Sequence, residues 1–144
     1  MSVSVTNTKK TIEILHVENS FADILLMKEV VKRSNFPIHL TVARTGEKAL
    51  EILKNSVESP HNVKPDLILL DMKLSRSGGR EVLGEIRASR RFQNMPIIIM
   101  GMSKKDRDAQ PGHKSNYFIA KPSDMGQFEE VIIYIDNFLR SRVS

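Results

Sequence analysis

Two acidic residues and one lysine of this chain could together carry phosphoryl chemistry, because each follows a short apolar run that resembles a buried strand. They are Glu18, Asp71 and Lys121. Two carboxylates at one edge of a sheet would attract a hard divalent cation such as Mg²⁺, which takes oxygen ligands and keeps several waters. An aspartate beside such a cation and a lysine can attack phosphorus and form an acyl phosphate. Taken singly, each residue has a plainer interpretation, since acids after strands often cap helices and a lysine before proline is often only exposed.

The elements that must position these residues alternate regularly between strand and helix along the chain. The predicted strands are 12–17, 38–43, 66–71, 96–101 and 117–120. The predicted helices are 21–34, a second that opens at Thr45-Gly46, a third that turns Val82, Leu83 and Ile86 inward, and 124–140. This order predicts a doubly wound α/β fold, with a five-stranded parallel sheet, right-handed crossovers and helices on both faces. In such a fold the ligand site lies at the carboxyl ends of the strands, where the three residues are expected.

The alternation falters between the fourth and fifth predicted strands. Residues 103–115 contain one apolar residue, Ala109, together with the helix-breaking pair Pro111-Gly112. These residues lack the apolar face of an ordinary amphipathic helix, so the fourth helix is predicted to be short or irregular. Residues 55–65 are polar and contain two prolines, which predicts a surface loop.

The composition fits one cytoplasmic domain. Hydrophobic residues make up 40% and charged residues 27% of the 144 residues, as in soluble globular domains. The absence of cysteine excludes disulfides, thiolate zinc sites and cysteine nucleophiles. No apolar run approaches the roughly 18 residues of a membrane span, and the polar start does not look like a signal peptide. We predict a flexible N-terminus at 1–11, one domain at 12–140 and a short tail at 141–144.

The chain is basic, with 22 lysine and arginine residues against 17 acidic residues and a formal net charge of +5. Much of the excess lies between residues 76 and 107, without the interleaved aromatic residues of a platform that binds single strands. We interpret it as a solvated basic face, so nucleic acid is not an expected partner.

Five stretches of the sequence are similar to the receiver domain of two-component response regulators, and the similarity spans residues 12–140. They are Ile14-Leu-His-Val-Glu-Asn-Ser-Phe-Ala-Asp23, Pro65-Asp-Leu-Ile-Leu-Leu-Asp-Met-Lys-Leu74, Gly79-Arg-Glu-Val-Leu83, Pro96-Ile-Ile-Ile-Met100 and Tyr117-Phe-Ile-Ala-Lys-Pro122. The chain most resembles the stand-alone receivers that partner phytochrome-type histidine kinases. That finer resemblance depends on Ala22-Asp23, on the long loop before Pro65 and on the final helix with Tyr134 to Phe138.

The resemblance implies a flavodoxin-like fold and a role for each site residue. Asp71 would be the phosphoacceptor, Glu18 would help to hold Mg²⁺, and Lys121 would contact the phosphoryl group. The backbone carbonyl of Lys73 would be a metal ligand, and the Lys121-Pro122 bond would be cis. Such a protein assists its own phosphorylation but is not an enzyme with independent turnover.

The sequence departs from the family pattern at three places that belong to one functional system. Asn19 stands where the family has a second acid, so it would be a weak or substituted ligand and Mg²⁺ affinity would fall. Gly101 stands where a threonine or serine would bind the phosphoryl oxygen, unless Ser103 substitutes, and Phe118 occupies the aromatic switch position. The third departure is the irregular segment 103–115. Asn19 could otherwise cap the first helix, and Gly101 could relieve crowding at a strand end.

Two functions therefore remain open. The first is a single-domain response regulator that receives a phosphoryl group from a histidine kinase on Asp71 and signals by binding other proteins. The second is a pseudo-receiver that keeps the fold and the interaction surface without phosphorylation. A flavin-binding electron carrier is disfavoured, because no phosphate-cradling Ser/Thr/Gly-rich loop follows the first strand. His16 is interpreted as a partly buried packing residue. The last helix carries more apolar residues than one buried face needs, at Tyr134, Phe138 and Leu139, which predicts a homodimer.

Overall fold

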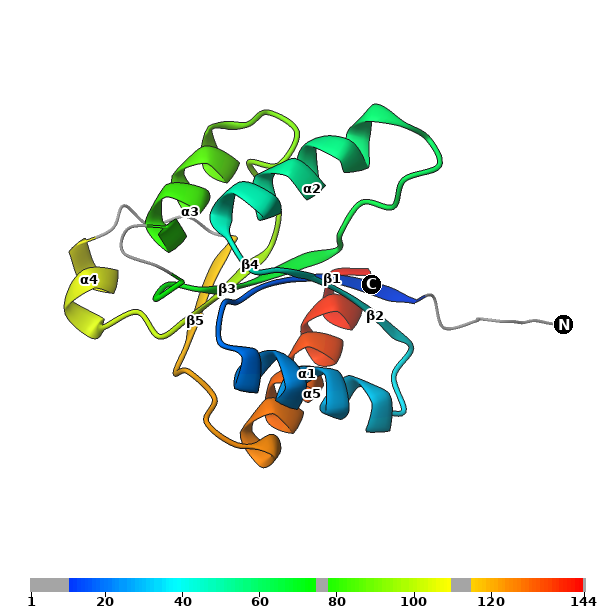
Figure 1. Cartoon of the computed structure of the whole chain (residues 1–144), viewed down its shortest axis with the longest axis vertical. Helices are drawn as coiled ribbons and strands as arrows, with labels where there is room; N and C mark the ends of the chain where they lie inside the picture. Colours follow the sequence, from blue (N-terminus) through cyan, green and yellow to red (C-terminus); the bar gives the residue numbers. More distant parts are fainter. Residues whose placement is uncertain (1–10, 75–77, 110–114, 144) are drawn as a thin grey trace, which may run out of the picture.

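The computed structural model describes residues 11–74, 78–109 and 115–143, and within them strands and helices alternate as the pattern predicts (Figure 1). The strands are β1 (Ile12–Val17), β2 (Ile38–Ala43), β3 (Leu67–Asp71), β4 (Ile97–Met100) and β5 (Asn116–Ile119). The helices are α1 (Phe21–Arg33), α2 (Gly46–Glu58), α3 (Gly78–Ala88), α4 (Lys104–Ala109) and α5 (Met125–Val143). The strands pair in parallel in the order β2-β1-β3-β4-β5, which confirms the doubly wound, flavodoxin-like sheet.

The sheet is covered on both faces, with α2 and α3 on one side and α1 and α5 on the other (Figure 1). Successive residues of a strand point to opposite faces. In β3, Ile68 and Leu70 therefore pack toward α2 and α3, while Leu67 and Leu69 pack toward α1 and α5. Because β3 and β4 are buried along their whole length, they form the rigid centre from which the ends of the strands project.

Two side-chain caps fix where the first two helices begin. Ser20 Oγ accepts a hydrogen bond from the Asp23 N–H at 3.3 Å, and Thr45 Oγ1 accepts one from the Lys48 N–H at 3.0 Å. Only Glu18, Asn19 and Ser20 separate β1 from α1, so the first turn of α1 lies directly beside the carboxyl end of β1.

The differences from the predicted boundaries are small and concern the ends of elements. The second helix continues to Glu58 into the predicted loop, and within this extension Ser56 is buried and its hydroxyl donates to the Leu53 carbonyl. The last helix runs to Val143 rather than 140, and β5 begins one residue earlier than predicted. The fourth helix has six residues and is short, as predicted.

The predicted division into an N-terminus, a domain and a tail stays a prediction, and residues 1–10 lie outside the described part of the chain. No helix in the described part is long and apolar enough to cross a membrane.

Candidate phosphoryl-acceptor site

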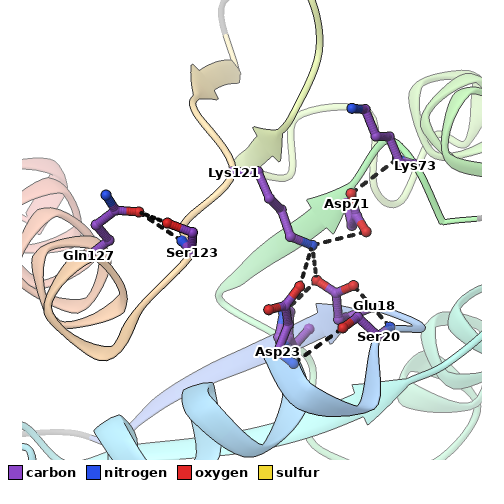
Figure 2. Close-up of polar contacts among 9 residues, drawn as sticks. Glu18, Ser20, Asp23, Asp71, Lys73, Lys121, Ser123 and Gln127 are labelled. Carbon is purple, nitrogen blue, oxygen red and sulfur yellow. Dashed lines mark hydrogen bonds and ion pairs between the residues drawn. The ribbon is translucent and has the colours of Figure 1, made fainter.

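The sheet order brings the predicted site residues to one place. The strands β1 and β3 are neighbours, with Val17 opposite Leu70, so Glu18 and Asp71 emerge side by side at their carboxyl ends. Lys121 follows β5 by two residues and reaches back to both acids, as Figure 2 shows. Its ammonium group forms an ion pair with Glu18 Oε1 and lies 3.0 Å from Asp71 Oδ2. The three residues expected to meet from their strand-end positions therefore do so.

A third carboxylate completes the contacts of Lys121. Asp23 Oδ2, from the first turn of α1, lies 3.2 Å from Lys121 Nζ. Sequence reasoning did not name Asp23 as a site residue, because an acid in the first turn of a helix is common and stabilises the helix on its own. We refer to Glu18, Asp23 and Asp71 as the acidic cluster.

Further contacts hold the two buried acids in position. The backbone N–H of Ser20 donates to Glu18 Oε2 at 3.1 Å, and that of Lys73 donates to Asp71 Oδ1 at 3.0 Å. Gly79 at the start of α3 packs on the backbone just after Asp71, where an added Cβ would lie 2.8 Å from Met72 Cα. A side chain at position 79 would therefore displace the chain that carries Asp71.

Burial and neighbouring charge set the ionisation of the site. Burial alone would raise the pKa of Glu18, but its contacts with His16 and Lys121 outweigh burial and lower the pKa from 4.5 to about 2. Burial raises the pKa of Asp71, and the neighbouring Glu18 adds to this rise, while Lys121 opposes it. Burial alone would lower the pKa of Lys121, but the carboxylates of Glu18 and Asp71 raise it. Lys121 is therefore a stable ammonium ion at neutral pH.

His16 lies in the layer beneath the acidic cluster. Its side chain is fully buried, rather than partly buried as predicted, and neither ring nitrogen has a hydrogen-bond partner among the described residues. The nearest acid is Glu18, with Oε1 3.7 Å from His16 Nε2, which is too long for a hydrogen bond. His16 is thus a polar group buried without a bonded partner.

The site thus consists of a buried aspartate, a second buried acid and a lysine at the carboxyl edge of a parallel sheet. The family model described as the response regulator receiver domain matches residues 14–133. The chain belongs to this family. The resemblance inferred from the sequence is confirmed by an independent match over most of the chain.

Individual relatives of this receiver domain agree in fold along most of their length. Response regulator Rcp1 from Synechocystis sp. is 31% identical over 127 residues, which cover 87% of this chain and 86% of Rcp1. The phosphorylated cyanobacterial phytochrome response regulator RcpA has a TM-score of 0.74 at 28% identity, covering 94% of this chain and 98% of RcpA. The Mn²⁺-bound form of Rcp1 has a TM-score of 0.71 at 30% identity, covering 88% of this chain and 93% of that structure. The likeness to phytochrome response regulators, noted from sequence motifs, is therefore confirmed.

Asn19 of this receiver domain directly follows Glu18, between β1 and α1. The residue is exposed, and its backbone carbonyl accepts a hydrogen bond from Arg44 at 3.3 Å. The suggestion that Asn19 caps the first helix is wrong, because Ser20 is the cap. Its role as a weak or substituted metal ligand stays a prediction.

Gly101 adopts a left-handed backbone, with φ of 80°, directly after β4. An added Cβ would meet Lys121 Cβ at 3.7 Å and Asp71 Oδ1 at 3.9 Å, which are ordinary contacts. The suggestion that this glycine relieves crowding is therefore wrong, because what position 101 requires is the positive φ that glycine adopts without strain. A threonine or serine would be strained at this backbone geometry.

Residues 101–109 follow β4 and include α4, and we call them the switch segment. Ser103 Oγ accepts a hydrogen bond from the Asp106 N–H at 3.1 Å, so its hydroxyl is bonded to the first turn of α4. The Arg107 guanidinium lies over the half-buried Phe118 ring, 5.7 Å from its centroid. The Lys121-Pro122 bond is trans, contrary to the expected cis bond, as in most prolyl bonds of folded proteins.

The donor atoms of the site suit a hard cation that retains water. Among the described residues, no group of three or more His, Cys, Asp or Glu side chains is arranged to hold a metal ion by itself. The carboxylate oxygens of Glu18 and Asp71 are nevertheless the type of ligand that Mg²⁺ and Mn²⁺ prefer, and these ions commonly complete their shells with water and backbone carbonyls. The residues present therefore fit a hydrated divalent cation.

Proposed function

We propose that this receiver domain is a single-domain response regulator that accepts a phosphoryl group on Asp71 from a histidine kinase. The observation that carries the proposal is the position of Asp71, which is almost fully buried and held between the Lys121 ammonium group and the Lys73 N–H. The similarity to Rcp1 and RcpA supports a kinase of phytochrome type as the partner. We expect this exchange in the cytoplasm.

In the transfer, a carboxylate oxygen of Asp71 attacks phosphorus. The phosphorus–nitrogen bond of the kinase phosphohistidine breaks, a phosphorus–oxygen bond to Asp71 forms, and the leaving imidazole takes up a proton. The Lys121 ammonium group, already 3.0 Å from Asp71 Oδ2, lies where it can neutralise the oxygens of the transferred group. Positioning and neutralisation are the contributions of this chain, so independent turnover is not expected.

Glu18, Asp71 and the backbone carbonyl of Lys73 are the groups that would hold Mg²⁺. When bound, the ion would neutralise charge on the phosphoryl oxygens during transfer. Asn19 adds no carboxylate, so we propose that the affinity for Mg²⁺ is lower than with an acid at position 19.

The output of the phosphorylated domain is proposed to be a change in protein contacts. The surface that carries this output includes α5, where Ile133 and Tyr134 are exposed. Phe138 is partly covered, since its ring packs edge-on against Tyr117 with centroids 4.6 Å apart. Pairing of two copies through α5 stays a prediction, which sedimentation at high concentration would test.

The proposal is tested by incubating the protein with a small acyl phosphate donor, with and without Mg²⁺, and reading the intact mass. The wild type is expected to gain one phosphoryl group in a Mg²⁺-dependent reaction, and Asp71→Asn is expected to gain none. Asn19→Asp is expected to react at lower Mg²⁺ concentrations, because it restores an acid beside Glu18.

The other outcomes distinguish the alternatives. If the wild type gains no phosphoryl group but Asn19→Asp does, Asp71 can accept the group and the lack of an acid at position 19 prevents the reaction in the wild type. If neither protein gains mass, the phosphorylation proposal is wrong, and a pseudo-receiver that works only by binding is favoured.

A further inference from the structure

The Lys121 ammonium group is held by one more acid than the proposed phosphoryl chemistry uses. Glu18 and Asp71 belong to that chemistry, whereas Asp23 has been given no role. Asp23 Oδ2 lies 3.2 Å from Lys121 Nζ, close to the 3.0 Å that separates Lys121 from Asp71 Oδ2. Figure 2 shows the side chains of the three acids pointing toward the end of Lys121 from β1, α1 and β3.

The local structure around Asp23 directs this carboxylate to Lys121. The backbone N–H of Asp23 is bonded to Ser20 Oγ, so the helix start is capped by the serine and does not need the Asp23 side chain. Asp23 is about one-fifth exposed, whereas Asn19 is exposed. The carboxylate that α1 contributes to the site therefore comes from its first turn.

The acids that face Lys121 differ in how many other partners they have. Glu18 also accepts from the Ser20 N–H, and Asp71 also accepts from the Lys73 N–H. For Asp23, Lys121 is the only partner of the side chain among the described residues. The Asp23 carboxylate is therefore committed to Lys121 in this structure.

We propose that Asp23 is a positioning residue of this site, which anchors the Lys121 ammonium group between Glu18 and Asp71 and supplies the third carboxylate charge that Asn19 does not. Three carboxylates facing one ammonium group leave two negative charges, so the site attracts a further cation. Without Asp23 only one negative charge remains, and the end of Lys121 loses one of its three anchors. The anchoring is independent of phosphorylation, whereas its consequence for Mg²⁺ rests on the proposed function.

The experiment compares the full-length wild type with Asp23→Asn, Glu29→Gln and the double variant Asp23→Asn with Asn19→Asp. Glu29→Gln is the matched control, because it removes one carboxylate from the same helix, where Glu29 pairs with the exposed Arg33. The first readout is the order of the Lys121 side chain, measured by NMR relaxation of its ammonium nitrogen. The second readout is the Mg²⁺ dissociation constant, with thermal unfolding recorded to verify that each variant is folded.

Asp23→Asn is expected to increase the mobility of the Lys121 ammonium group, while Glu29→Gln leaves it unchanged. Asp23→Asn is also expected to weaken Mg²⁺ binding about tenfold, because one negative charge is removed from the acidic cluster. The double variant is expected to recover most of the Mg²⁺ affinity, because a carboxylate is returned to the same edge of the sheet, but not the order of Lys121.

Equal order of Lys121 in Asp23→Asn and in Glu29→Gln would overturn the positioning role. Loss of order without any Mg²⁺ binding by the wild type would support the positioning role and contradict the metal part of the proposed function. Loss of order in Asp23→Asn, together with a wild type that is not phosphorylated on Asp71, would support the positioning role and contradict the proposed function.

Discussion

The acidic cluster and the switch segment lie at the same edge of the sheet, but their side chains are engaged in different ways. In the acidic cluster, three carboxylates face one ammonium group, and two backbone N–H groups complete the bonding of the buried acids. In the switch segment, Gly101 offers no side chain, the Ser103 hydroxyl accepts from the Asp106 N–H at the start of α4, and the Arg107 guanidinium lies over the ring of Phe118 in β5. The carboxylates that would take part in phosphoryl transfer are thus already bonded in place, and Lys121, which follows β5, links them to the region that would respond.

This difference has a structural origin in the sheet. The acidic cluster depends on β1 and β3, which are flanked by neighbours on both sides, whereas the switch segment joins β4 to the edge strand β5. Glu18 and Asp71 are therefore anchored in the buried centre, whereas Lys121 follows the edge strand and the response geometry depends on a short exposed helix. Four substitutions would sharpen or break this comparison.

The largest effect is expected from Gly79→Ala, which tests how tightly the acceptor is built. The added methyl group would lie within 3.0 Å of three backbone atoms of Asp71 and Met72, so we expect a loss of about 3 kcal/mol in the free energy of unfolding and weaker phosphorylation. Gly84→Ala in the same helix is the control. Its Cβ would meet nothing within 4 Å, and we expect a gain of about 0.5 kcal/mol. Chemical denaturation measures both, and similar effects in the two variants would contradict the close approach.

Removing the central cation of the acidic cluster ranks next. Lys121→Met leaves Glu18 buried without its ammonium partner, and we expect a loss of about 2 kcal/mol at neutral pH. The pKa of Glu18 is lowered from 4.5 to about 2 in the folded wild type, so its stabilising contribution is present above pH 4.5 and is lost as the pH falls toward 2. The difference between the two proteins should therefore be largest above pH 4.5 and shrink below it. A difference that does not change between pH 7 and pH 2 would show that Glu18 is not the acid that Lys121 stabilises.

His16→Leu is expected to act in the opposite direction. A buried imidazole without a hydrogen-bond partner carries a desolvation cost that leucine avoids. We expect this cost to exceed the support that the imidazole gives to the Glu18 carboxylate from 3.7 Å, with a net gain of about 1.5 kcal/mol. His39→Leu makes the same replacement at an exposed position of β2 and is expected to change stability little. Thermal unfolding of both variants provides the measurement. A loss of stability in His16→Leu would mean that the imidazole supports Glu18 more than the 3.7 Å separation indicates.

The smallest effect is expected in the switch segment. Gly101→Ala places a side chain on a backbone with φ of 80° and should cost about 1 kcal/mol, although the space for a methyl group is present. Gly126→Ala in α5, where φ is not positive, is the control and should be neutral or slightly stabilising. If Gly101→Ala were as stable as the wild type, the backbone could turn to accept a side chain, and a hydroxyl could be restored at this position.

The sequence was sufficient to predict the fold and the core of the site. Apolar runs such as Leu67–Leu70 require burial on both faces, and alternation with helices then determines that the strands are parallel. Because parallel strands end at the same edge, the sequence predicts that Glu18, Asp71 and Lys121 lie together, and the structure places them in contact. The match of the family model over residues 14–133 agrees with this prediction.

The details that were missed depend on backbone geometry and on contacts distant in sequence. Asp23 could not be assigned from its position, because only the folded chain brings the first turn of α1 to a lysine 98 residues later. The positive φ of Gly101 and the close approach of Gly79 are set by how the loops close over the sheet. The trans state of the Lys121-Pro122 bond also lies beyond the local sequence.

The position of β5 at the edge of the sheet has a consequence for how the molecule opens locally. The strand has four half-buried residues and pairs only with β4, whereas β3 is buried throughout and pairs on both sides. Strands at an edge separate at a lower free energy than central strands, so amide hydrogens of β5 should exchange with solvent faster than those of β3. Lys121 is carried by the chain that leaves β5, and transient separation of this strand would withdraw the ammonium group while Glu18 and Asp71 stay in place.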